Sequence, residues 1–299
     1  MRLSYFFVLV ILVLSACTGR HESSAEGTKN DRGTDSFTHY AAGFRVQNLE
    51  SHRLLTVTDP WQESKNVVFR YVLASKAELV PDSLKDVPFI KTPVERVIAL
   101  STTHAAMIDQ LGSAESIVGL SGTDFIYSPA IRTRIKSGEI RDVGYGQGLD
   151  FEAIVRLNPD VLFLYGVEGN VMTTLEKLRD LGIPAVFCGE YLETHPLGKA
   201  EWIRFFSLFY NKEDQSAGFF HRIDSSYNAM IVKASEANSL PKVLNGLPWK
   251  DTWYMAGGES FAAQLMEDAS GDYLWRETSS TQALPLDLES VYIRAINAD

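Results

Sequence analysis

Short apolar runs alternate with amphipathic segments through the middle of the chain. The apolar runs cover residues 97–100, 117–120, 160–165 and 183–187. Segments with apolar residues at helical spacing lie between them, at 103–111, 151–157 and 171–181. Buried strands that alternate with helices predict a mostly parallel sheet with helices on its faces. We term the stretch 93–196 the N-lobe.

A long helical pattern follows the N-lobe. From about 197 to 237, aromatic and aliphatic residues recur at helical spacing, with a turn near Asn211. No glycine cluster or polar linker separates residues 197–240 from their neighbours. We therefore expect connecting helices there, the second of which forms a rigid spine between two lobes.

A second α/β unit begins at residue 241, and we term it the C-lobe. Part of its pattern repeats the N-lobe, because Leu149-Asp150-Phe151-Glu152 and Leu286-Asp287-Leu288-Glu289 each precede a short helical segment. In the first copy Asn158-Pro159-Asp160 and an apolar strand follow the helix, whereas the second copy stops at Asn297-Ala298-Asp299. We therefore expect 241–299 to be an incomplete lobe.

The residues before the N-lobe have two different patterns. Residues 37–92 contain short β-rich runs that are broken near Asp59-Pro60 and at 63–66, which predicts an antiparallel N-terminal β appendage. Residues 17–36 are polar and predict a disordered tether. The expected fold class is thus α/β, with two Rossmann-like lobes joined by a long rigid helix and an N-terminal β appendage.

The first residues resemble a bacterial lipoprotein signal. A basic start precedes an unbroken apolar run at 5–14, which is shorter than the about 20 residues needed to span a bilayer. Small residues then precede Cys17. The resemblance implies that 1–16 is a signal peptide and that acylated Cys17 anchors the protein to the membrane. An ordinary cleaved signal is the alternative.

Composition excludes several classes of function. The formal net charge is -10, and nucleic acid would require a basic footprint, so we expect no nucleic-acid partner. Cys17 and Cys188 are the only cysteines, and the apolar neighbours of Cys188 predict a buried, inert thiol. The six histidines are dispersed, and the sequence contains no H-E-x-x-H, C-x-x-C or G-x-S-x-G motif. We therefore expect no enzyme and no resident cofactor.

The chain from about residue 94 onward resembles the class III solute-binding proteins of iron-siderophore, haem and cobalamin importers. The segments that carry the resemblance are 94–100 (VERVIAL), 148–152 (GLDFE), 158–162 (NPDVL) and 178–185 (LRDLGIPA). Their order and spacing are more specific than any one of them. The N-terminal β appendage lies outside the usual core of that family, which leaves its role open.

The resemblance implies how the protein works. A ferric siderophore, haem or cobalamin sits between the lobes as cargo, and the loaded protein docks onto an ABC permease dimer with its ATPase. One glutamate on each lobe engages arginines of the permease. Glu152 matches the first glutamate, and Glu267 is our choice for the second, with Asp268 as the alternative register. Exposed charges of this kind steer encounter and set the register of docking.

Ligands of open α/β units bind beyond the carboxyl ends of the strands. The cleft residues expected from this rule are Ser101, Thr102, Thr103, His104, Tyr127, Tyr165 and Tyr191 in the N-lobe, with Trp253 and Phe261 in the C-lobe. Aromatic side chains suit a large planar or greasy chelate. His104 either ligates haem iron or cobalt, or lies in the first turn of a helix that the preceding Ser and Thr residues cap.

We therefore expect a periplasm-facing lipoprotein that captures a metal chelate for an ABC importer. Two alternatives remain, namely a lipid-anchored protein that binds a free metal ion and a surface protein-interaction module.

Overall fold

The computed structural model describes residues 37–167, 171–296 and 298. The expected signal peptide, the acylated Cys17 and the tether lie outside these residues. Among the residues that the structure does describe, no helix has both the length and the apolar character that crossing a bilayer requires.

The N-terminal β appendage is a four-stranded sheet in the order β1-β2-β3-β4. Its strands are β1 (Phe44–Asn48), β2 (Arg53–Thr58), β3 (Val68–Ala74) and β4 (Phe89–Lys91). The first three pair in antiparallel fashion, as predicted, whereas β4 runs parallel to β3. A parallel partner requires a crossover connection, and residues 75–88 supply it through two 3-10 turns, η1 (Ala77–Leu79) and η2 (Asp82–Leu84).

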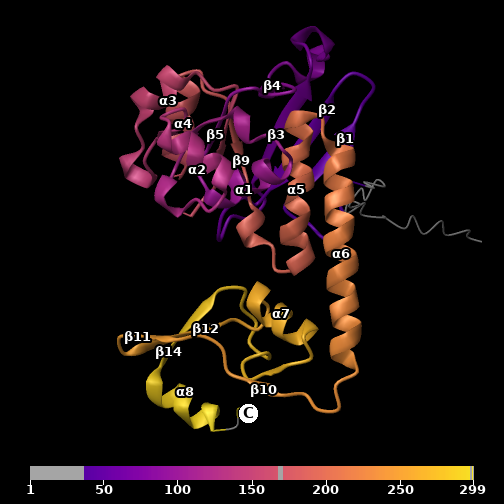
Figure 1. Ribbon diagram of the computed structural model, residues 1–299, viewed down its shortest axis with the longest axis vertical. Helices are drawn as coiled ribbons and strands as arrows, with labels where there is room; N and C mark the ends of the chain where they lie inside the picture. Colours follow the sequence, from indigo (N-terminus) through magenta and orange to yellow (C-terminus); the bar gives the residue numbers. More distant parts are fainter. Residues whose placement is uncertain (1–36, 168–170, 297, 299) are drawn as a thin grey trace, which may run out of the picture. The chain divides into compact units, whose positions relative to one another are not determined.

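A five-stranded, all-parallel sheet forms the centre of the N-lobe, in the order β7-β6-β5-β8-β9. Its strands β5 and β9 are labelled in Figure 1. Its strands are β5 (Val97–Ala99), β6 (Ile117–Leu120), β7 (Arg141–Asp142), β8 (Val161–Leu164) and β9 (Ala185–Phe187). The helices between them are α1 (Thr102–Gln110), α2 (Pro129–Lys136), α3 (Phe151–Leu157) and α4 (Val171–Asp180). The α/β fold class is therefore confirmed. The sequence pattern missed β7 and α2, because a two-residue strand and a strongly basic helix show little apolar periodicity.

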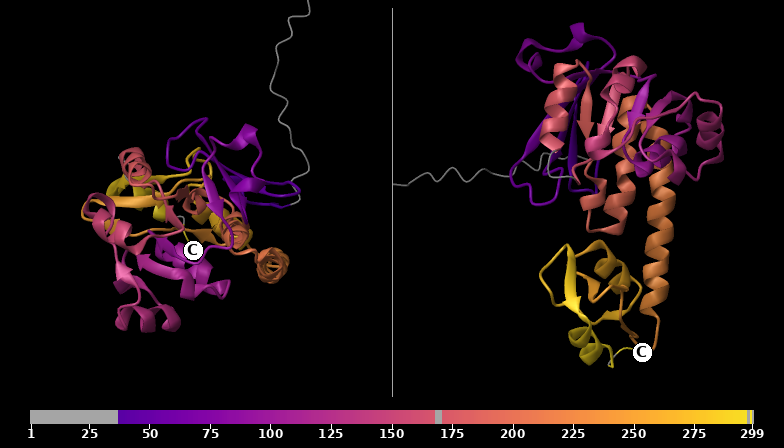
Figure 2. Two further views of the ribbon diagram at one scale, coloured as in Figure 1. Left: turned by 90° about the horizontal axis from the view of Figure 1, so that it is seen from above. Right: turned by 90° about the vertical axis from the view of Figure 1, so that its left-hand side faces the viewer.

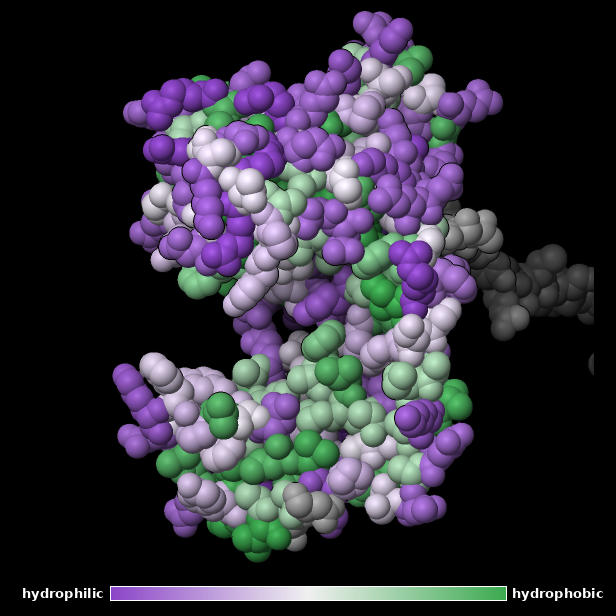
Figure 3. Space-filling view, viewed as in Figure 1, coloured by the Kyte–Doolittle hydropathy of each residue, from purple (hydrophilic) through white to green (hydrophobic). Residues whose placement is uncertain are grey.

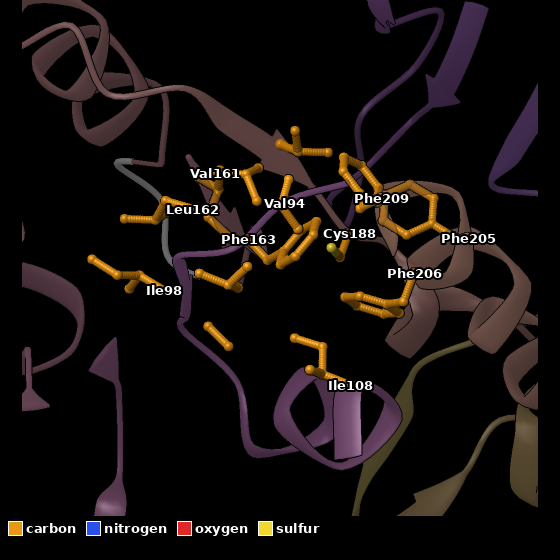
Figure 4. Close-up of a cluster of buried hydrophobic side chains, with 14 of the residues drawn as sticks. Val94, Ile98, Ile108, Val161, Leu162, Phe163, Cys188, Phe205, Phe206 and Phe209 are labelled. Atoms are coloured by element: carbon orange, nitrogen blue, oxygen red, sulfur yellow. The ribbon is translucent and has the colours of Figure 1, made fainter. Parts of the chain in front are cut away.

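Helix α5 (Pro196–Tyr210) packs its aromatic side chains against this sheet (Figure 4). The rings of Phe206 and Phe209 lie 5.0 Å and 4.8 Å from the ring of Phe163 on β8. On the appendage side, the ring of Phe44 on β1 lies 4.8 Å from Trp202. Helix α5 thus contacts both sheets, which is why it is buried on nearly every side although it carries a carboxylate at Glu201.

Two buried carboxylates hold the backbone that leads into β1, and we term them the carboxylate clamp. Glu201 on α5 accepts hydrogen bonds from the N–H groups of residues 39–41 at 2.8–3.0 Å. Glu193 accepts hydrogen bonds from the N–H groups of residues 42 and 43 at 2.9–3.1 Å, and another from Trp202 Nε1 at 2.9 Å. Hydrogen bonds to an ionised acceptor are stronger than neutral ones, so the clamp fastens the appendage to α5.

Helix α6 (Glu213–Ser235) begins just after Asn211, whose backbone is left-handed with φ of 53°. The turn at Asn211 is where the sequence pattern placed it. Helix α6 runs unbroken for 23 residues, or about 35 Å. Figure 2 shows it as one continuous helix. It forms the long helix that precedes the C-lobe.

The C-lobe has a small core of its own, formed by Met255, Ala263, Tyr273, Trp275 and Val291. Its helices are α7 (Phe261–Asp268) and α8 (Leu288–Ala295), and its strands are β10 (Lys242–Val243), β11 (Pro248–Trp249), β12 (Thr252–Ala256), β13 (Asp272–Tyr273) and β14 (Ala283–Asp287). Strands β10 and β13 pair in parallel, but β11, β12 and β14 form an antiparallel sheet, unlike the N-lobe. A two-residue hairpin at 250–251, with φ of 56° at Lys250, enforces the antiparallel pairing of β11 with β12.

Hydrophobic residues gather on one face of the C-lobe in Figure 3. The large apolar side chains that the C-lobe exposes include Leu247, Trp249, Tyr254, Tyr292, Ile293 and Ile296.

The internal repeat corresponds to two helices with the same cap. The carboxylate of Asp150 accepts a hydrogen bond from the N–H of Ala153 at 2.9 Å at the start of α3. The carboxylate of Asp287 accepts a hydrogen bond from the N–H of Ser290 at 2.8 Å at the start of α8. Each repeat therefore places a glutamate at the second position of an Asp-capped helix.

We predict that Glu201→Gln lowers the free energy of unfolding by about 2 kcal/mol, because the amide keeps only one acceptor oxygen and would place an NH2 donor against backbone N–H groups that the second carboxylate oxygen now accepts from. Urea unfolding measures the change. Glu152→Gln, whose carboxylate is exposed, is the matched control and should leave the value within about 0.5 kcal/mol of wild type. Equal stability of the two variants would contradict the role of the clamp.

Candidate functional site

The carboxyl ends of β5 and β8 form the topological switch point of the parallel sheet. From β5 the chain moves outward through β6 to β7, and it then returns to the other side of β5 to form β8 and β9. Loops that leave neighbouring strands in opposite directions open a crevice at such a point, where α/β proteins bind ligands. This edge of the sheet is therefore the candidate ligand site.

A cavity of about 50 Å³ lies at this edge. Its lining includes Leu100 after β5, Ser121 after β6, Tyr165 and Val167 after β8, and Tyr145 from the loop before α3. Among the described residues that line it, none carries a charge. The cavity is thus an apolar and aromatic recess with a few hydroxyl groups, which is the composition of many small-molecule sites.

Local backbone geometry positions the loops around this cavity. Ser101 caps α1 by accepting a hydrogen bond from the N–H of Thr103 at 3.2 Å, which fixes the turn after β5. The hydroxyl of Ser121 donates to the carbonyl of Gly144 and so ties the loop after β6 to the loop after β7. Thr102 is half-buried and Thr103 is exposed, and neither residue lines the cavity.

Aromatic side chains are exposed beyond β6 and β7. Tyr127 is 90% exposed, Tyr145 is 73% exposed and Phe125 is 72% exposed. Large aromatic side chains normally bury most of their surface, so three exposed ones near one edge of a sheet offer stacking surfaces. Of these three, only Tyr127 was among the cleft residues expected from the sequence. Phe125 lies in the same segment after β6, and Tyr145 follows β7 of the same sheet.

His104 does not face the cleft, which corrects its expected position. It lies in the first turn of α1, is fully buried, and contacts Glu190 across a distance of 3.2 Å between Nε2 and Oε1. Glu190 is also buried. Burial by itself would raise the pKa of Glu190, but the adjacent His104 imidazole outweighs burial and holds that pKa below the ordinary glutamate value.

Tyr165 and Tyr191 lie next to this buried pair. Their ring centroids are 6.2 Å apart, and the Tyr165 ring lies 6.0 Å from the His104 ring. The Tyr191 hydroxyl donates to the carbonyl of Gly166 at 2.9 Å. Burial raises the pKa of Tyr191 to about 12, so this phenol remains a neutral hydrogen-bond donor at physiological pH.

The two C-lobe candidates are engaged by other contacts. Trp253 on β12 donates from Nε1 to the carbonyl of Asn245 at 3.2 Å. Phe261 is the first residue of α7, and the Lys199 ammonium on α5 lies 4.4 Å from its ring centroid, a cation–π contact. Neither residue lines the cavity at the switch point.

The proposed docking carboxylates lie on exposed helical positions. The Glu152 side chain is 88% exposed, with Arg156 at 3.7 Å, and Glu267 is exposed and pairs with Arg276. Asp268 instead accepts a hydrogen bond from the Tyr227 hydroxyl on α6 at 2.6 Å. That bond makes Asp268 the poorer candidate of the two.

Glu289 was missed as a docking candidate. It is exposed and occupies the same position of an Asp-capped helix as Glu152. The signal that could have found it was the repeat LDFE and LDLE, which the sequence analysis used only to infer a duplicated lobe.

Metal-ligating and reactive groups are few in the part of the chain that the structure describes. Within it, no three His, Cys, Asp or Glu side chains converge as a metal site would require. Cys188 is buried in the core, where burial raises the pKa of its thiol well above the ordinary value, and Glu190 adds to that rise. The prediction of a buried, inert thiol is confirmed.

Comparison with known proteins identifies the family. Residues 97–298 match the model of the family described as periplasmic binding protein. This match covers more than half of the chain, and the chain therefore belongs to the periplasmic binding protein family. The family consists of solute-binding proteins, not enzymes.

A relative that is similar in sequence is a lipoprotein by name. An uncharacterized lipoprotein of Methanocaldococcus jannaschii is 29% identical over 245 residues, which cover 77% of this chain and 58% of that protein. This chain therefore spans a little more than half the length of that relative.

Two solved structures share the fold. A possible iron-binding (periplasmic solute-binding) protein of Staphylococcus epidermidis aligns with a TM-score of 0.56 and 18% identity, covering 68% of this chain and 75% of that one. The periplasmic heme-binding protein HutB of Vibrio cholerae aligns with a TM-score of 0.54 and 21% identity, covering 67% and 72%. At these identities the likeness concerns the fold alone.

We predict that the stabilising effect of Glu190 depends on pH. Because the folded-state pKa of Glu190 is lowered, its ionised form favours folding at neutral pH, and this contribution is lost as the pH falls through the folded-state pKa, below about 4.3. The difference in unfolding free energy between wild type and Glu190→Gln should therefore shrink between pH 7 and about pH 3. Urea unfolding at both pH values measures it, and a difference that does not change with pH would refute the paired state.

Proposed function

We propose that this protein is the substrate-binding lipoprotein of an ABC importer and that its cargo is a metal chelate, namely a ferric siderophore, haem or cobalamin. The observation that carries the proposal is the aromatic cavity, whose described lining residues carry no charge, at the switch point of a parallel sheet in a periplasmic binding protein fold. A recess of about 50 Å³ would hold only one apolar edge of such a chelate, and the exposed aromatic rings beside it offer stacking surface for the rest.

The residues that line the cavity suit some of the three classes of cargo better than others. A carboxylate-rich ferric siderophore requires cationic side chains, and the described lining contains none. Of the nearby arginines, Arg134 already pairs with Glu139 at 3.0 Å. A ligand with a large uncharged surface therefore fits this half of the site better than a polyanion.

The alternative of a free metal ion has less support. A metal ion needs several converging oxygen, nitrogen or sulfur ligands, and the described residues bring no three His, Cys, Asp or Glu side chains together.

The alternative of a protein-interaction module rests on the exposed apolar face of the C-lobe, but that module would not need an aromatic recess at the switch point.

Membrane attachment follows from the proposed acylation of Cys17. The relative from Methanocaldococcus jannaschii is named a lipoprotein, which supports the same attachment here. Residues 17–36 would then tether the binding protein to the membrane that contains its permease.

Docking would use one exposed glutamate from each lobe. Glu152 is the N-lobe residue, and the C-lobe offers Glu267 and Glu289. The repeat favours Glu289, because Glu152 and Glu289 share the same helical position and the same Asp cap. A permease dimer presents the same surface twice, and equivalent residues on the two lobes match that symmetry.

We predict submicromolar, one-to-one binding of haem, cyanocobalamin or ferrichrome by the protein that begins at Cys17, measured by calorimetry. Tyr165→Ala should weaken the binding of the recognised chelate at least tenfold, or about 1.4 kcal/mol, because it removes an aromatic wall of the cavity. Tyr292→Ala, an exposed tyrosine on α8, is the matched control and should bind like wild type. A folded protein that binds none of the three probes would overturn the proposal.

We predict that Glu152→Gln and Glu289→Gln each reduce ligand-stimulated ATPase activity of the reconstituted importer at least fivefold while leaving chelate affinity unchanged. Glu95→Gln, another exposed glutamate of the N-lobe, is the control and should have no effect. Loss of stimulation in Glu267→Gln with full activity of Glu289→Gln would instead assign the C-lobe contact to α7.

A further inference from the structure

The N-terminal β appendage touches the loops of the candidate site. It lies outside residues 97–298, which match the family, so family membership does not explain its presence. Its contacts with the N-lobe include one short segment, residues 60–62, which lies in the connection between β2 and β3. Each residue of this segment meets a loop that follows β8 or β9.

Trp61 makes the central contact. It forms a parallel bridge with Gly166, directly after β8, and its ring lies 5.4 Å from the ring of Phe187 at the end of β9. A methyl group on Gly166 would overlap the Cβ of Trp61, so glycine is needed there for the two backbones to approach. Tyr165 and Val167, which flank Gly166, both line the cavity.

The neighbours of Trp61 extend the contact to the loop after β9. The backbone of Gln62 lies close enough to the hydroxyl of Tyr191 to act against the rise of its pKa, and that hydroxyl donates to the carbonyl of Gly166 at 2.9 Å. Pro60 lies against Gly189, where an added Cβ would be 3.7 Å from the Pro60 Cα. The segment therefore joins the two loops that follow β8 and β9.

The sheet behind this segment supports it. On β3, the ring of Phe69 lies 4.6 Å from Phe187, and the hydroxyl of Tyr71 accepts a hydrogen bond from the N–H of Phe187 at 3.1 Å. The carboxylate clamp fastens the other end of the appendage to α5. The segment is thus held from both sides and not free to move away from the site.

We propose that the N-terminal β appendage is an accessory wall of the ligand site, in which Trp61 and Gln62 act as positioning residues for the Tyr165–Val167 loop and for Tyr191. The proposal rests on the proposed function only in assigning a ligand to this site. The appendage sets the width of the recess on its β8–β9 side and thereby contributes to ligand selectivity, which a protein limited to the family core could not do in this way.

Hydrogen exchange of the full mature chain tests the positioning role without a ligand. In Trp61→Ala, amides in residues 164–167 and 187–192 should exchange at least tenfold faster than in wild type, whereas Trp61→Phe should restore most of the protection. Leu55→Ala, a buried change in β2 of the same sheet, is the matched control and should not single out these two segments. Wild-type exchange in both segments of Trp61→Ala would overturn the proposal.

Tyr191→Phe supplies a second variant in case Trp61→Ala does not fold. It keeps the ring and removes the hydroxyl that lies between Gln62 and the carbonyl of Gly166, so exchange in residues 164–167 should again rise, and unchanged exchange would count against the proposal.

Titration with haem, cyanocobalamin and ferrichrome tests the effect of the appendage on ligand binding. The probe that binds wild type should bind Trp61→Ala about tenfold more weakly, and equal affinity would refute the selectivity role. If wild type binds no probe, the proposed function fails, while the exchange result still decides the positioning role.

Discussion

The burial of α5 against two sheets is the constraint on which the rest of the structure depends. One side of this helix packs Phe205, Phe206 and Phe209 against the parallel sheet, and Trp202 meets Phe44 of the appendage. Glu201 is fully buried on the same helix, and its desolvation is tolerated because three backbone N–H groups surround the carboxylate. The same helix therefore fixes the sheet that carries the site and the appendage that borders it.

The position of the site follows from this arrangement. With the sheet held from the α5 side, its carboxyl edge presents loops from β5, β6, β8 and β9 in fixed order, and the order reversal at β5 and β8 opens the recess. The His104–Glu190 contact is buried beside Tyr165, one of the residues that line the recess, and so supports the loop after β8 from the core. Helix α6 then continues without a break, and an unbroken helix has few residues that can absorb a large hinge motion.

Much of the fold was predictable because the strongest sequence signals are also the most buried elements. The strands near Val97, Ile117, Val161 and Ala185 and the helices α1, α3, α4 and α5 follow from apolar periodicity. Features set by pairing were not predictable in this way, because the parallel β4 and the antiparallel sheet of the C-lobe depend on connections and turns more than on periodicity. Two-residue strand β7 was too short to produce a pattern.

The candidate site was predicted only in part, for a related reason. The rule that places ligands at carboxyl strand ends selected the edge of the sheet where the cavity lies. It could not tell that His104 turns into the core to meet Glu190, since that contact joins residues 86 positions apart (190 minus 104). Nor could it find Trp61, which reaches the site from a segment outside the family match. Glu289 was within reach, because it follows from the repeat itself.

A crystal structure of the mature protein bound to the chelate that it recognises would test the position of the ligand site most directly. We expect the ligand at the carboxyl edge of the parallel sheet, in contact with Tyr145 and Tyr165, with the contact between Trp61 and Gly166 retained beside it. A chelate bound at the amino ends of the strands, or on the exposed apolar face of the C-lobe, would contradict the proposed location of the ligand site.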